Sequence, residues 1–104
     1  MNKLPMLNPG RILMTPGAMD ALATAKQKPS EFLIKHVMGD WGDLDTNDAS
    51  ANRRALTTGD RLLSSYKTAN DDPLWIITEA VDIEVPGTIA HVRAVTTIML
   101  PEEY

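Results

Sequence analysis

The sequence contains no cysteine among its 104 residues. This absence excludes disulfide bonds, a thiol nucleophile and every zinc site that needs a thiolate ligand. No segment approaches the ~20 apolar residues that cross a membrane. The amino terminus, Met1 to Pro5, also lacks the apolar centre of a signal peptide. We therefore expect a cytoplasmic protein that has no contact with a membrane.

An excess of positive charge is also missing, since the formal net charge is −4. Lysine and arginine are scattered along the chain, apart from the pair Arg53–Arg54. Affinity for nucleic acids comes largely from neutralised phosphates and needs a basic face, so nucleic-acid binding is disfavoured. An acidic protein is better suited to occupy a basic surface on another protein.

The composition, 43% hydrophobic and 23% charged, is that of an ordinary globular protein. A chain of this length forms one core and is too short for a second domain. We expect a single domain over residues 1–104. Residues 1–10 would be an irregular lead-in, because Pro5, Pro9 and Gly10 interrupt any regular pattern.

The pattern after the lead-in predicts a strand and three helices. An apolar run at 11–14 indicates the strand, and Thr15 followed by Pro16 caps a helix that continues to about Lys26. Its inner face would carry Ala18, Met19 and Leu22. The second helix would span about 29–38, with an apolar side formed by Phe32, Leu33, Ile34 and Val37.

The third helix is capped by Asp45 or Thr46, runs to about Thr58 and stops at Gly59. It is polar and has only Ala51, Ala55 and Leu56 to bury. The pattern then changes from helical to alternating. This change predicts strands over 61–68, 74–85 and 88–100.

The last two strands would form a long hairpin around Pro86–Gly87, with its tip, residues 82–92, projecting from the sheet. A tight turn there pairs Asp82 with His91, Ala80 with Arg93, and Ile76 with Thr97, although this turn type allows a register shifted by one. The predicted fold class is α+β: three helices packed on one face of a small antiparallel sheet, with a long C-terminal β-hairpin.

The most unusual segment is Gly39–Asp48, in which carboxylates surround Trp41. Asp43, Asp45 and Asn47 match three ligand positions of a calcium loop, but Asp48 replaces its glycine and Arg54 its final glutamate. Calcium binding is therefore disfavoured, and the carboxylates are better explained as helix caps and solvated loop residues. Trp41 either anchors the loop in the core or serves as a binding hot spot. Trp75, in mid-strand, is expected in the core.

Candidate catalytic residues are few. His36 and Asp40 are four residues apart at the end of a helix, where the imidazole can hydrogen-bond the carboxylate, but they lack a third partner. Ser64–Ser65 has no surrounding Gly-x-Ser-x-Gly pattern, and the isolated glycines form no phosphate-binding loop. An enzyme is not favoured, and no cofactor or metal is expected. The alternative is a small enzyme or metal-binding protein built around His36, Glu79 and the acidic loop 40–48.

Five segments along most of the chain carry a resemblance: Thr15–Ala18, Glu31–Val37, Gly39–Asp43, Trp75–Glu79 and Thr96–Tyr104, of which the most distinctive stretch runs from 36 to 43. In the same order, they resemble segments of a family of small proteins found on bacterial plasmids and other mobile elements. The family has no established activity, so the resemblance implies no catalytic residues. Compared with the family, about residues 83–92 are inserted and lengthen the hairpin.

The leading hypothesis is a small, acidic, non-enzymatic accessory protein of a mobile element that acts by protein–protein contact. In its specific form, the protein inhibits a host defence system by covering a basic surface. The candidate contact residues lie in the acidic loop and the hairpin tip: Trp41, Asp40, Asp43, Asp45, Ile83, Glu84, Val85 and Ile89. A homodimer that associates through its hairpin or a helix face is a further alternative.

Overall fold

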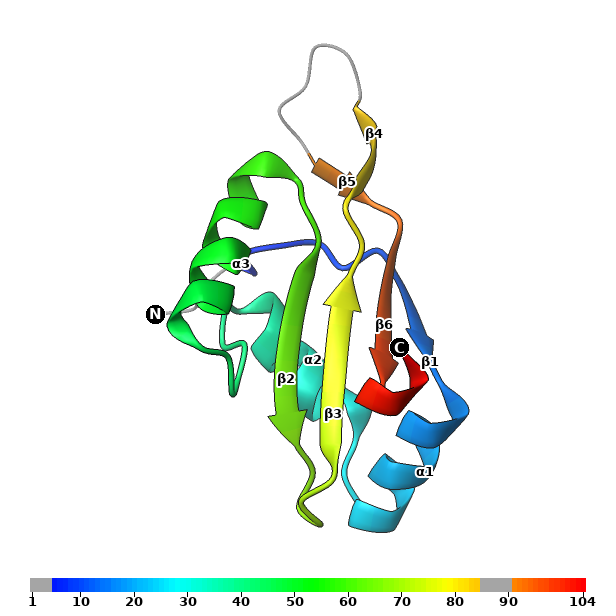
Figure 1. Cartoon of the computed structure of the whole chain (residues 1–104). Helices are drawn as coiled ribbons and strands as arrows, with labels where there is room; N and C mark the ends of the chain where they lie inside the picture. Colours follow the sequence, from blue (N-terminus) through cyan, green and yellow to red (C-terminus); the bar gives the residue numbers. More distant parts are fainter. Residues whose placement is uncertain (1–4, 85–90) are drawn as a thin grey trace.

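The computed structural model describes residues 5–84 and 91–104 (Figure 1). This part of the chain forms three α-helices, six strands and one short 3-10 helix. The order is β1 (Arg11–Met14), α1 (Pro16–Ala25), α2 (Pro29–Val37), α3 (Thr46–Thr58), β2 (Leu62–Lys67), β3 (Pro73–Thr78), β4 (Val81–Glu84), β5 (His91–Arg93), β6 (Val95–Met99) and η1 (Pro101–Glu103).

The main sheet has four strands in the order β1-β6-β3-β2. β2, β3 and β6 pair antiparallel, as predicted, whereas β1 runs parallel to β6. The α+β fold class is confirmed, and the sheet is mixed rather than wholly antiparallel. The sequence pattern identified β1 as a strand, but a four-residue apolar run does not reveal which strand it will pair with.

The C-terminal hairpin is divided into two parts with different registers. In the main sheet Ile76 pairs with Ile98 rather than with Thr97, a shift of one residue from the predicted pairing. β4 and β5 form a separate two-stranded sheet, in which an irregularity between Val81 and Ile83 shifts the register again.

Two other predicted pairs are consequently wrong. His91 pairs with Glu84 rather than with Asp82, and Arg93 pairs with Val81 rather than with Ala80. An irregularity of this kind adds a residue to one strand only, so a count from the turn cannot anticipate it. Figure 1 shows β4 and β5 beyond the end of the main sheet.

The core lies between the helices and one face of the sheet; α2 crosses behind the strands in Figure 1. One buried cluster consists of Ala18, Leu22, Phe32, Tyr66, Leu74, Ile76 and Ile98. A second consists of Leu7, Trp41, Ala55 and Leu62. The predicted inner positions Met19 and Ile34 were wrong, since these side chains are 53% and 60% exposed. The polar residues His36 and Asn52 occupy buried helix positions instead.

The opposite face of the sheet carries no helix in the described chain and is partly covered by the C-terminal segment. Trp75 is half-buried there, and Tyr104 packs edge-on against it with ring centroids 5.9 Å apart. The guanidinium of Arg61 lies over the Tyr104 ring. Glu103 fastens this segment to the start of α1, because its carboxylate accepts hydrogen bonds from the Thr15 hydroxyl and the Gly17 amide.

The β2 edge of the sheet is closed by hydrogen bonds. The Asn52 side chain donates to the Leu63 carbonyl at 2.7 Å and accepts from the Leu63 amide at 3.2 Å. One turn of the acidic loop continues this pairing, because the Ser65 amide donates to the Trp41 carbonyl and the Asp43 amide donates to the Ser65 carbonyl. An outer edge that would otherwise expose unpaired backbone groups is thereby satisfied.

We expect Asn52→Ala to lower the free energy of unfolding by about 1–3 kcal/mol, because it leaves the partly buried Leu63 amide and carbonyl without their side-chain partner. Urea unfolding at neutral pH measures this change. Asn47→Ala removes the same side chain from an exposed position on α3 and should change the free energy by less than about 0.5 kcal/mol. Equal effects of the two substitutions would contradict the role assigned to Asn52.

Candidate functional site

His36 lies at the centre of a buried polar cluster between α2 and the sheet. Its side chain is fully buried, as are those of Ser64 on β2 and Thr78 on β3. The Nδ1 atom lies 2.6 Å from Ser64 Oγ, and the Nε2 atom lies 2.7 Å from Thr78 Oγ1. The imidazole therefore faces the sheet, and the hydrogen bond to Asp40 considered from the sequence does not form.

The hydrogen-bond directions in this cluster can be assigned by starting at Thr96, the member farthest from His36. Thr96 Oγ1 lies 2.7 Å from the Pro9 carbonyl and must donate to it, so its oxygen accepts from Thr78. Thr78 has then used its only proton and must accept from His36 Nε2–H. The Nδ1 atom accepts from the Ser64 hydroxyl. The geometry thus places a proton on Nε2, and Nδ1 accepts from Ser64 when the imidazole is neutral.

Burial and the positive charge of Arg93 both favour this neutral form and lower the pKa of His36 to about 4. Protonation would place a second proton on Nδ1, where the Ser64 hydroxyl already donates. The cluster therefore stabilises the fold at neutral pH, and this stabilisation is lost in acid because the unfolded chain takes up the proton more readily.

This arrangement does not support catalysis. Ser64 and His36 lie at the distance of a nucleophile and its base, but both side chains are completely buried and no substrate can contact them. Asp40 and Asp43 are exposed and line one hollow, but the buried His36 and the exposed Glu79 do not line it. Within residues 5–84 and 91–104 no group of three histidine or carboxylate side chains is placed to hold a metal ion.

A hollow of about 610 Å³ lies between α1, η1 and the start of β3. Its ionisable lining residues are Asp20, Asp72 and Glu102. All three are carboxylates, and no histidine, lysine or arginine accompanies them among the lining residues.

Lowering the pH from 7 to 5 should reduce the free energy of unfolding by about 2 kcal/mol through His36. The pKa of this group is about 4 in the folded protein and about 6.5 when unfolded, so the unfolded chain binds more protons between these values. Stability is therefore retained above about pH 6.5 and lost as the pH falls toward 4. Urea unfolding across this range measures the loss, and the non-titrating variant His36→Gln should show a smaller slope. Equal slopes would contradict the assigned pKa.

The acidic loop, residues 39–48, is held rigidly against the sheet. Trp41 is only 8% exposed, and its ring packs in the second core cluster. The Tyr66 hydroxyl donates to the Asp40 carbonyl, and burial raises the pKa of that tyrosine. Gly42 has φ +75°, and a Cβ there would lie 2.1 Å from the Ser65 carbonyl oxygen. Trp41 is thus an anchor, the first of the two roles considered from the sequence, and its ring is not presented as a contact surface.

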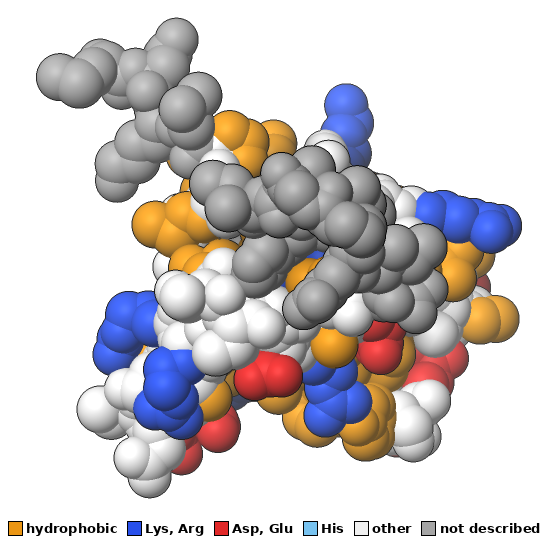
Figure 2. All heavy atoms as spheres, turned by 90° about the horizontal axis from the view of Figure 1, so that it is seen from above, with side chains coloured by type: hydrophobic (Ala, Val, Ile, Leu, Met, Phe, Trp, Pro, Cys, Tyr) orange, Lys and Arg blue, Asp and Glu red, His pale blue; other side chains and the backbone are white. Residues whose placement is uncertain are grey.

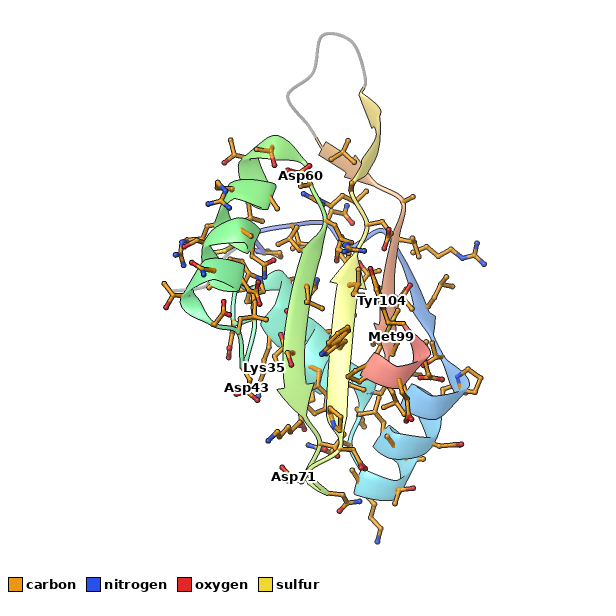
Figure 3. The ribbon with its side chains drawn as sticks, in the orientation of Figure 1. Lys35, Asp43, Asp60, Asp71, Met99 and Tyr104 are labelled. Atoms are coloured by element: carbon orange, nitrogen blue, oxygen red, sulfur yellow. The ribbon has the colours of Figure 1, made fainter. Side chains whose placement is uncertain are left out.

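The carboxylates of this loop point to solvent. Asp40, Asp43, Asp45 and Asp48 are all exposed. Within the described chain none of them makes a salt bridge; Asp45 caps α3 by accepting from the Asp48 amide at 2.7 Å. A hollow of about 270 Å³ is lined by Asp40 and Asp43 together with Lys35 and Lys67. Figure 3 shows Lys35 and Asp43 on this side of the molecule, next to β2.

The base of the hairpin is fixed by Arg93, which is 6% exposed. Its guanidinium donates to the carbonyl oxygens of Ala55, Asp60 and Glu79 at distances of 2.8–3.1 Å. Burial lowers the pKa of this side chain, while the charge of Asp60 opposes that shift. No local sequence signal marks Arg93, because the carbonyls it binds come from three separate segments.

The candidate contact residues of the hairpin are only partly within the described chain. Ile83 and Glu84 belong to β4 and pair with Val92 and His91. Val85 and Ile89 lie outside the described residues. The structure therefore tests the backbone pairing of the hairpin base and not the contact surface proposed for its tip.

Comparison of the chain with protein-family models, with curated proteins and with solved structures finds no match. In the described residues no helix has the length and apolar character needed to cross a membrane. Viewed from the hairpin end, Figure 2 shows acidic and basic side chains interspersed, with no continuous basic patch on the described surface of this face.

Proposed function

We propose that this chain is a protein-binding accessory protein of a mobile genetic element and that its acidic loop contacts a basic surface of the partner. The observation that best supports this proposal is the combination of exposed carboxylates with a loop backbone that is hydrogen-bonded to the sheet. Asp40 and Asp43 face solvent, while the backbone between them is hydrogen-bonded to β2 and the intervening tryptophan is buried.

A rigid loop favours binding because little conformational entropy remains to be lost when a partner docks. The exposed carboxylates can accept charge-assisted hydrogen bonds from arginine or lysine side chains. They would also accelerate association with a basic partner and prevent contact with acidic ones. Such binding weakens as salt screens the charges.

The partner in this proposal is a host protein with a basic surface, such as the nucleic-acid-binding face of a defence protein. The resemblance to proteins of mobile elements, carried in part by Gly39–Asp43, supports this choice. The net charge of −4 supports it as well, because a protein that covers a nucleic-acid site must present negative charge. The completely buried His36 and Ser64 give no support to an enzymatic alternative.

We expect the double variant Asp40→Asn/Asp43→Asn to recover at least about tenfold less partner than the unchanged protein in affinity purification from the host. Each substitution keeps the shape of the side chain and removes its charge. The matched control is Asp20→Asn/Asp71→Asn, which removes two exposed carboxylates elsewhere and should leave recovery unchanged. Recovery of the partner should also fall as salt is raised.

Equal recovery by the two double variants would contradict a role for the acidic loop. A purification that recovers no stoichiometric partner with the unchanged protein would contradict the binding function itself. These two failures are distinguishable because the first requires a partner and the second has none.

A further inference from the structure

The two edges of the main sheet differ in whether their outward backbone groups have hydrogen-bond partners. The β2 edge is closed by Asn52 and by the backbone of Trp41 and Asp43. The β1 edge has no covering element within the described chain, and Figure 1 shows β1 as the outermost strand on its side. Ile12 and Leu13 are 40% and 42% exposed there. Exposed apolar edge strands are templates for pairing with another strand.

The free hydrogen-bonding groups of β1 can be identified from its pairing with β6. Arg11 and Thr15 donate their amides to the Ala94 and Ile98 carbonyls. Backbone groups alternate in direction along a strand, so those of Ile12 and Met14 point away from β6. Among the described residues no partner is recorded for these outward groups.

We propose that β1 pairs antiparallel with β1 of a second copy of this chain, with the two-fold axis at Leu13. In this register Ile12 of each copy pairs with Met14 of the other, and four backbone hydrogen bonds form. A two-fold axis at Ile12 would instead bring Gly10 opposite Met14. Gly10 has φ +67° and its amide is already bonded to Asn8, so it cannot continue the ladder.

Charge complementarity supports the same register. Arg11 is exposed and faces Thr15 of the second copy, with which it shares a face of the sheet. The hydroxyl of Thr15 is bonded to the Glu103 carboxylate, so each Arg11 approaches an exposed glutamate across the axis. Glu103 stays ionised, because hydrogen bonds from Thr15, Leu100 and Gly17 lower its pKa. No like charges are opposed along the two strands.

The paired sheets would form one continuous apolar row on the face without helices. Leu13, Thr97, Ile77 and Leu63 are aligned across the four strands by the observed registers. The second copy adds the same row in reverse order, with Leu13 of one copy against Leu13 of the other at the two-fold axis. Figure 2 shows hydrophobic side chains at the surface beside basic ones on the β1 side of the molecule. The acidic loops lie at the opposite edges, so this dimer does not depend on the function proposed above.

Cysteine cross-linking tests the register directly, because the natural chain has no cysteine. Leu13→Cys places two thiols on the axis at a non-hydrogen-bonded pair, where the Cα atoms are close enough for a disulfide. We expect a covalent dimer with oxidised glutathione under non-denaturing conditions. The matched variant Ile12→Cys faces Met14 of the second copy and should cross-link at least about tenfold more slowly. Equal rates for the two variants would overturn the register.

Sedimentation equilibrium tests the dimer itself. The unchanged protein should show a concentration-dependent shift from monomer to dimer, and Leu13→Lys should weaken the dimer at least about tenfold by opposing two charges at the axis. Ile34→Lys makes the same change at an exposed apolar site on α2 and should leave the dimer intact. If the unchanged protein stays monomeric at submillimolar concentration, the proposal is overturned. The β1 edge would then be available to a strand from another protein.

Discussion

The fold depends on the requirement that polar groups removed from water find hydrogen-bond partners. The series Ser64–His36–Thr78–Thr96–Pro9 meets this requirement in the middle of the protein. It joins α2 to three strands and to the N-terminal lead-in, so one hydrogen-bonded series links five segments that are far apart in sequence. Because each hydroxyl has a single proton, the donors of the series all point from the imidazole toward the Pro9 carbonyl, and Ser64 donates to the ring when the histidine is neutral.

The same requirement explains the periphery. Asn52 takes the place of a neighbouring strand at the β2 edge, and Arg93 donates to the carbonyls of Ala55, Asp60 and Glu79, which joins the end of α3 to the base of the hairpin. Among the described residues, Trp41 Nε1 is the buried side-chain atom without a partner. At the β1 edge, the outward backbone groups of Ile12 and Met14 have no recorded partner among the described residues. The polar groups of the interior are therefore mostly bonded within the protein, and two features face outward: the acidic loop and the β1 edge.

Local signals were sufficient for the helices and insufficient for the long-range pairing. Asp45 and Gly59 mark both ends of α3, and the structure places that helix at Thr46–Thr58 with these two caps. The parallel position of β1 and the shifted hairpin register depend on contacts between distant segments, which periodicity does not encode. His36 was considered for its chemistry, yet its burial against the hydroxyls of Ser64 and Thr78 could be known only after the sheet was assembled. For the candidate site, the carboxylates were predictable from composition, whereas the fixed loop backbone was not.

The proposed function assigns contact with other molecules to the surface, because His36 is fully buried. The most direct test is the nitrogen NMR spectrum of the His36 ring between pH 6 and pH 8, assigned by comparison with His36→Gln. A neutral ring protonated on Nε2, with no titration in this range, is expected from the hydrogen-bond directions. A ring that titrates near its ordinary pKa, or carries its proton on Nδ1, would contradict the buried series and reopen His36 as a chemical group.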